Sequence, residues 1–72
     1  MKQHVKNTHT LRDGTEIGMV CIGEWIDLAR YWEGSDGNAW ATGNSRNSWV
    51  NKGPIAEFRQ HFAARFRGEL YQ

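Results

Sequence analysis

Apolar side chains recur at helical spacing near the C-terminal end of the sequence. They stand at positions i, i+3, i+7 and i+11, which is one face of a helix: Ile55, Phe58, Phe62 and Phe66. Pro54 suits the first turn of that helix, because the N–H that proline lacks would have no partner there. Gly68 stands where a residue just beyond a helix often needs a positive φ. The spacing predicts a helix over residues 54–67.

The central part of the chain has the composition of β-strands. Residues 15–22, TEIGMVCI, form a short apolar run after the turn-like RDGT, and they predict a strand. Residues 24–33, EWIDLARYWE, allow both a helical stripe and a strand-like alternation. The SDGN that follows at 35–38 is typical of a hairpin turn, and a hairpin needs a strand on each side. We therefore expect a strand over 24–33, with a helix as the alternative.

These elements predict an α+β fold in which a three-stranded antiparallel sheet packs on one C-terminal α-helix. The third strand would begin with AWAT at 39–42, and residues 42–53 would form a long loop into the helix. Residues 1–10 are polar and would form a flexible arm. Residues 1–72 are expected to form a single small domain. A small all-α fold with a helix-turn-helix is the alternative.

The order of these elements resembles two groups of small DNA-binding domains, the AP2 type and the arm-binding N-terminal domains of tyrosine recombinases. In those families a Trp-bearing strand precedes a hairpin, a Gly closes the third strand, and an Ala/Arg-rich helix packs behind the sheet. The matching positions within residues 15–68 are Trp25, Gly43, Ala63, Ala64 and Arg65. The resemblance implies binding in the DNA major groove through sheet residues. This chain departs from that pattern, because Arg30 is the only basic residue of its expected strands.

A second stretch, NAWATGNSRNSWVNKGPI, is similar to the Cro-like helix-turn-helix of phage repressors. In those repressors a Gly-containing turn leads into a Ser/Arg-rich recognition helix. The similarity implies that residues 24–32 form the preceding helix. The chain departs from that family in length, because too few residues separate Ser45 from Trp49 for a full recognition helix.

Charge and composition narrow the functional classes only slightly. Nine Lys and Arg residues against eight Asp and Glu leave a net charge of +1, which permits nucleic-acid binding without indicating it. A single Cys excludes a disulfide within the chain. The longest apolar run, residues 19–22, is too short to span a membrane or to form the core of a signal peptide. We expect a soluble, cytoplasmic protein that binds no membrane, and its small size is compatible with a homodimer.

The residue pattern does not point to catalysis, to a metal or to a cofactor. The His and Cys residues lack the close spacing of a zinc site: His4, His9, His61 and Cys21. Cys21 lies in the most apolar run, where a buried thiol is inert. Glu24 and Asp27 would point to opposite faces of a strand, or would form a surface pair on a helix, and neither arrangement indicates a catalytic acid–base pair. We expect no enzymatic activity, no cofactor and no metal site.

The candidate binding residues lie mainly in the expected loop before the helix: Arg46, Trp49 and Lys52, with Arg30 on the expected sheet. Polar residues before a helix N-terminus can bind an anion, Lys and Arg contact nucleic-acid phosphates, and bases stack on Trp. We predict a non-enzymatic nucleic-acid-binding protein with an accessory or regulatory role, encoded by a mobile element or a phage. The alternative is a small protein-binding inhibitor or adaptor that acts on a host or defence protein.

Overall fold

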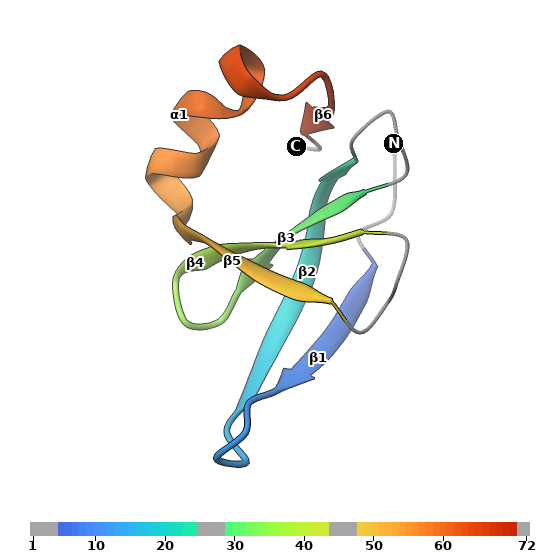
Figure 1. Ribbon diagram of the computed structural model, residues 1–72, viewed down its shortest axis with the longest axis vertical. Coiled ribbons are helices and arrows are strands. Elements are labelled where there is room, and N and C mark those ends of the chain that lie inside the picture. The colour runs from blue at the N-terminus through green and yellow to red at the C-terminus, as the bar shows by residue number, and fades with distance from the viewer. Residues whose placement is uncertain (1–4, 25–28, 44–47, 71–72) are drawn as a thin grey trace.

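A curled antiparallel sheet and one short helix make up the computed structural model, which describes residues 5–24, 29–43 and 48–70 (Figure 1). In chain order the elements are β1 (Lys6–Thr10), β2 (Glu16–Glu24), β3 (Arg30–Gly34), β4 (Asn38–Thr42), β5 (Trp49–Pro54), α1 (Ile55–Arg65) and β6 (Glu69–Leu70). From β1 to β5 the strands neighbour one another in chain order. The short β6 pairs with the C-terminal end of β2.

The predicted α+β fold with a three-stranded sheet is wrong, because the described chain is mostly sheet with one short helix. The all-α alternative is wrong for the same reason. β1 forms from part of the expected arm, where KNTHT is polar throughout and gains its strand conformation by pairing with β2. β5 forms within the expected loop and also takes in Pro54, which was expected to begin the helix, and it pairs with β4. Backbone pairing with a neighbouring strand therefore overrides the local composition in both segments.

Other predicted elements are confirmed with shifted ends. The strand expected at 15–22 is β2, and the helix expected at 54–67 is α1, which ends at Arg65. The predicted hairpin turn joins β3 to β4. Of the strand expected at 24–33, Glu24 belongs to β2 and β3 begins at Arg30, while residues 25–28 lie outside the described residues.

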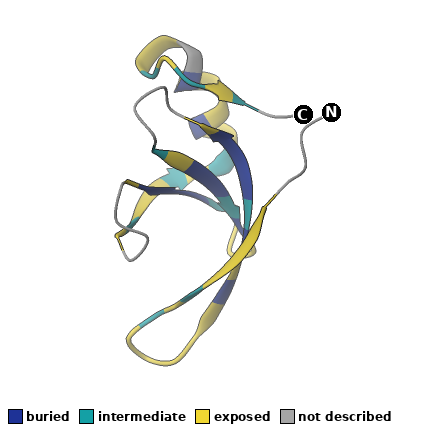
Figure 2. Cartoon of the chain, turned by 90° about the vertical axis from the view of Figure 1, so that its right-hand side faces the viewer, coloured by how far each residue is buried: buried dark blue, intermediate teal, exposed yellow. Residues whose placement is uncertain are grey.

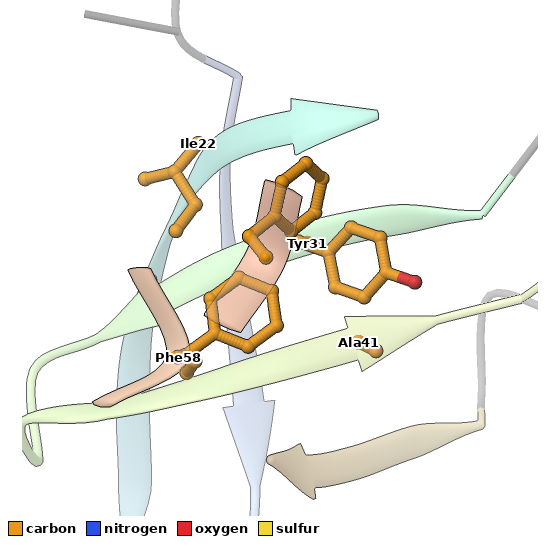
Figure 3. Close-up of a cluster of buried hydrophobic side chains, with 6 residues drawn as sticks. Ile22, Tyr31, Ala41 and Phe58 are labelled. Atoms are coloured by element: carbon orange, nitrogen blue, oxygen red, sulfur yellow. The ribbon is translucent and has the colours of Figure 1, made fainter. Parts of the chain in front are cut away.

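Most residues of the central strands are buried (Figure 2). Their side chains pack into two cores, one on each face of the sheet. The helix-side core lies between the sheet and α1: Ile22, Tyr31, Ala39, Ala41, Phe58 and Phe62, with Ile55, Phe66 and Leu70 packed against it. Ile22, Tyr31 and Phe58 point toward one another there (Figure 3). The helical stripe expected from the sequence is thus confirmed as the face that covers the sheet. The inner core lies on the opposite face: Ile17, Met19, Cys21, Trp32 and Trp40, with Leu11 and Trp49 packed against it.

The sheet curls until its two end strands approach each other. β1 and β5 stand at opposite ends of the strand order, yet the rings of His9 and Trp49 stack with centroids 5.3 Å apart and planes at 27°. His9 also contacts Trp40, with centroids 5.3 Å apart. In Figure 1, the ribbon of β5 crosses that of β2, and one end of β5 lies near the upper end of β1. These rings close the open side of the inner core.

The turn between β3 and β4 ties three parts of the fold together. The Ser35 backbone N–H donates to the Gly18 carbonyl at 2.8 Å, and the Ser35 hydroxyl accepts from the Gly18 N–H at 3.1 Å. The Gly37 carbonyl accepts a hydrogen bond of 3.0 Å from the N–H of Ile55, the first residue of α1. The first N–H groups of a helix have no partner within the helix. The turn therefore helps to fix where α1 begins.

The C-terminal segment packs on the end of β2 through two glycines. Gly68 was expected to take a positive φ beyond the helix, and this is wrong: α1 ends at Arg65, and Phe66 already adopts extended backbone, with φ −126° and ψ 144°. A Cβ at Gly68 would instead overlap the Glu24 carbonyl group and lie 2.7 Å from the Phe62 ring. A Cβ at Gly23 would lie 2.6 Å from the Glu69 carbonyl oxygen. Both positions need glycine because two backbones meet there.

Candidate functional site

The structure does not bring the predicted binding residues together. Trp49 faces the inner core, where its ring contacts His9 and Trp32. Lys52 lies on the opposite side of β5, beside α1. Arg30 stands at the start of β3, where its Nε lies 3.5 Å from a Glu24 carboxylate oxygen. Arg46 lies outside the described residues.

These separate positions follow from the geometry of β5. Trp49 lies opposite Thr42, and Asn51 lies opposite Trp40, so both side chains belong to the inner face. The register then shifts before Gly53, so that Lys52 is the extra residue of a bulge. Gly53 takes a positive φ of 93° there. Trp49 is therefore half-buried and packs against the inner core. Among the described residues that were predicted to bind a ligand, Lys52 is the one that lines a surface groove.

That groove runs between the end of β5 and one side of α1 and has a volume of about 530 Å³. Its lining combines two cations, one histidine, one carboxylate and two phenyl rings: Lys52, Glu57, Phe58, His61, Arg65 and Phe66. Glu57, His61 and Arg65 follow one another at i, i+4 and i+8, so the helix itself aligns them in a row. Lys52 faces this row from β5.

Phe66 is the more accessible of the two phenyl rings that line the groove. Phe58 and Phe62 are 6% and 2% exposed, whereas Phe66 is only half-buried. Its centroid lies 5.8 Å from that of Phe58 and 5.6 Å from that of Phe62. The Lys52 ammonium lies 5.9 Å from the centre of the Phe66 ring, within cation–π range. The groove thus combines an accessible aromatic surface with a neighbouring cation.

The segment that supplies the lining of the groove is more basic than the chain as a whole. Residues 52–67 hold four of the nine Lys and Arg residues and one of the eight Asp and Glu residues. The sequence interpretation did not assign the other lining residues to a site: Glu57, Phe58, His61, Arg65 and Phe66. The i, i+4 row beside the apolar stripe was a signal for Glu57, His61 and Arg65. No local pattern could have placed Lys52 opposite that row, because the placement depends on the bulge in β5.

The described residues offer little other chemistry. They contain no group of three or more His, Cys, Asp or Glu that could hold a metal ion. Burial raises the pKa of the Cys21 thiol. The thiol also donates a hydrogen bond to the Gly23 carbonyl, with Sγ 3.7 Å from the oxygen. A raised pKa disfavours the thiolate, which is the reactive form. The groove places Lys52 and Arg65 beside the Phe66 ring, and this combination of groups can bind an anionic ligand.

Comparisons of the chain with protein-family models, with curated proteins and with solved structures found no match. The resemblances to AP2-type domains, recombinase arm-binding domains and Cro-like repressors therefore stay predictions. Within the described ranges, no helix has the length and apolar character needed to cross a membrane.

Proposed function

We propose that this protein is a non-enzymatic nucleic-acid-binding module that contacts phosphates through the groove between β5 and α1. The observation that carries the proposal is the placement of Lys52 and Arg65 in one groove with the Phe66 ring. Lys and Arg supply the phosphate contacts on which most nucleic-acid affinity depends. An aromatic ring beside them offers a stacking surface, which is the usual companion of such contacts.

The concentration of Lys and Arg residues in the segment 52–67 supports this function despite the small net charge of the chain. Binding depends on the charge near the ligand, because exposed charges more than about 8–10 Å away are largely screened at physiological ionic strength. Acidic residues that lie farther than this from the bound phosphates therefore weaken binding less than the net charge suggests. Glu57 is the carboxylate within the groove, at the end nearest the N-terminus of α1. It opposes the positive helix end and limits the affinity of the groove for anions.

The direct test is binding of a fluorescein-labelled, mixed-sequence oligonucleotide, followed by fluorescence anisotropy at two salt concentrations. We expect binding that weakens steeply with salt, because phosphate contacts release condensed counterions. Lys52→Gln and Arg65→Gln should each raise Kd by about two- to fivefold, the scale of exposed charge pairs. Each should also reduce the salt slope by about 0.7, the value for one phosphate of a single strand.

Arg59→Gln is the matched control for these variants. Arg59 is an exposed cation of the same helix, but it does not line the groove. The substitution Arg59→Gln removes one positive charge, as Lys52→Gln and Arg65→Gln do. A general electrostatic effect would therefore lower the affinity equally in all three variants. An equal loss would contradict the assigned groove. Absence of binding at low salt would exclude the nucleic-acid function and favour the alternative, a protein-binding inhibitor or adaptor.

A further inference from the structure

We infer that the groove is specific for single-stranded nucleic acid, with one unpaired base stacked on Phe66 and its phosphates held by Lys52 and Arg65. This inference rests on the proposed function and adds the class of ligand to it. The choice of a single strand is argued from the shape of the groove and from the exposure of the Phe66 ring. Neither feature depends on the charges of Lys52 and Arg65.

The backbone after α1 places Phe66 where a ligand can reach it. The helix ends at Arg65, and the extended Phe66 is anchored by its N–H, which donates to the Phe62 carbonyl at 2.8 Å. The Phe66 ring rests against Tyr31, with centroids 5.3 Å apart, as well as against Phe58 and Phe62. Buried neighbours thus hold the ring in place while part of it stays in solvent. A ring fixed in advance loses little entropy when a base stacks on it.

Lys52 is suited to exchange its position over the ring for a phosphate. Its ammonium lies 5.9 Å from the Phe66 centroid and its side chain is exposed. A lysine side chain is a flexible stem with a compact charge. A base can therefore take its place on the ring, while the ammonium moves to the phosphate of the same nucleotide. Arg65, in the same groove, supplies the contact for a further phosphate.

A duplex cannot use this ring without losing its own stacking. Its bases are stacked on their neighbours, and removing one from the stack costs a few kcal/mol. A volume of about 530 Å³ lies within the range of small-ligand sites and can accept a single unpaired nucleotide. The charges of the groove would attract a duplex as well as a single strand. The difference in affinity between the two therefore depends on stacking against the Phe66 ring.

The decisive experiment uses the unaltered protein and three probes of matched length, about 12 nucleotides, within the span that one small binding domain covers. They are an oligothymidine, a strand in which every residue is an abasic analogue, and a duplex. The abasic strand keeps the phosphates and lacks the bases. We expect the oligothymidine to bind between about five- and 150-fold more tightly than the abasic strand, which is the effect of one stacked base. The oligothymidine should also bind more tightly than the duplex.

A pair of ring variants provides the second measurement. Phe66→Leu removes the stacking surface and should lower affinity for oligothymidine toward that for the abasic strand. Trp49→Leu is the matched control, because Trp49 is also a half-buried ring but packs against the inner core and does not line the groove. Thermal unfolding of both variants shows whether they are folded at the assay temperature. The probe comparison with the unaltered protein decides the question even if either variant unfolds.

The outcomes separate this inference from the proposed function. If Lys52→Gln and Arg65→Gln weaken binding but the oligothymidine and the abasic strand bind equally, the inference is wrong and the function stands. If none of the three probes binds at low salt, both are wrong. If polyglutamate of matched charge displaces the oligothymidine as well as unlabelled oligothymidine does, the groove binds acidic peptides, and both are again overturned.

Discussion

The indole N–H of Trp32 donates a hydrogen bond of 2.9 Å to the hydroxyl of Thr42 within the inner core. Both residues are buried, with Thr42 6% exposed, and they lie on the neighbouring strands β3 and β4. A buried donor without a partner is costly, so this bond lets a large polar-tipped ring occupy the core. Thr42 is the buried polar residue of the described chain, and its partner accounts for it.

Replacing Thr42 by Val should destabilise the protein by about 1–3 kcal/mol, because the variant keeps the shape and leaves the Trp32 N–H without its acceptor. The free energy of unfolding is measured by urea denaturation followed by tryptophan fluorescence. Thr10→Val is the control, since Thr10 is an exposed strand residue and a surface change usually stays within about 0.5 kcal/mol. An equal effect of the two changes would show that the hydrogen bond contributes nothing.

Gly34→Ala should also destabilise the fold, by about 1–3 kcal/mol, the range for overpacking. A Cβ at this position would lie 2.5 Å from a carboxylate oxygen of Asp36 and 2.9 Å from the indole nitrogen of Trp40. Asp36 accepts hydrogen bonds from that indole and from the Asn38 N–H, so it cannot move without loss. Thermal and urea unfolding measure the change.

Gly43→Ala is the matched control for this prediction. A Cβ at Gly43 would meet nothing within 4 Å, and Gly43 is not among the glycines with positive φ. Adding a methyl group where the backbone permits it restricts the unfolded chain and is neutral or slightly stabilising. Similar losses for both variants would mean that the crowding around Asp36 and Trp40 does not explain the glycine at position 34.

Stability should fall in alkaline solution through two buried groups. Burial raises the pKa of the Cys21 thiol above its ordinary 9.0 and that of the Tyr31 hydroxyl above its ordinary 10.0. Each group thus binds its proton more tightly in the folded state than in the unfolded state. Its contribution is complete below the unfolded pKa and is lost as pH rises through the folded pKa.

Urea unfolding between pH 7 and 10.5, about the range that spans both ordinary values, measures this loss. Tyr31→Phe removes one of the two groups, so the decline in its unfolding free energy above pH 9 should be smaller than in the unaltered protein. The other titrating groups are common to both proteins and serve as the internal control. Parallel declines would contradict a role for the Tyr31 hydroxyl.

Removing the carboxylate from the groove should strengthen binding to nucleic acid. Glu57→Gln should lower Kd by about two- to fivefold, since it removes a negative charge close to the bound phosphates. It should also cost about 0.3–1 kcal/mol of stability, because a negative charge in the first helical turn is favourable. Anisotropy titrations well below the unfolding temperature measure the affinity. Glu33→Gln, on β3 away from the groove, is the control, and an equal gain there would contradict the local effect.

Short-range patterns in the sequence determined the elements whose conformation depends on near neighbours. The i, i+3, i+7 spacing of Ile55, Phe58 and Phe62 led correctly to α1 and to the face that it buries. The SDGN stretch led correctly to the turn between β3 and β4, and the apolar run from Met19 led to β2. In each of these segments the side-chain period or the turn residues favour one backbone conformation by themselves.

The tertiary structure alone decided the end strands, their curl and the candidate site. β1 and β5 are polar or interrupted by Gly and Pro, so their strand conformation comes from hydrogen bonds to β2 and β4 that no local pattern encodes. The bulge in β5 turns Lys52 toward α1 and leaves Trp49 on the inner core, which separates two residues that the sequence grouped together. Side-chain direction in a strand changes with each residue and shifts at a bulge. Contacts between distant segments therefore determined the groove, although its helical row was already present in the sequence.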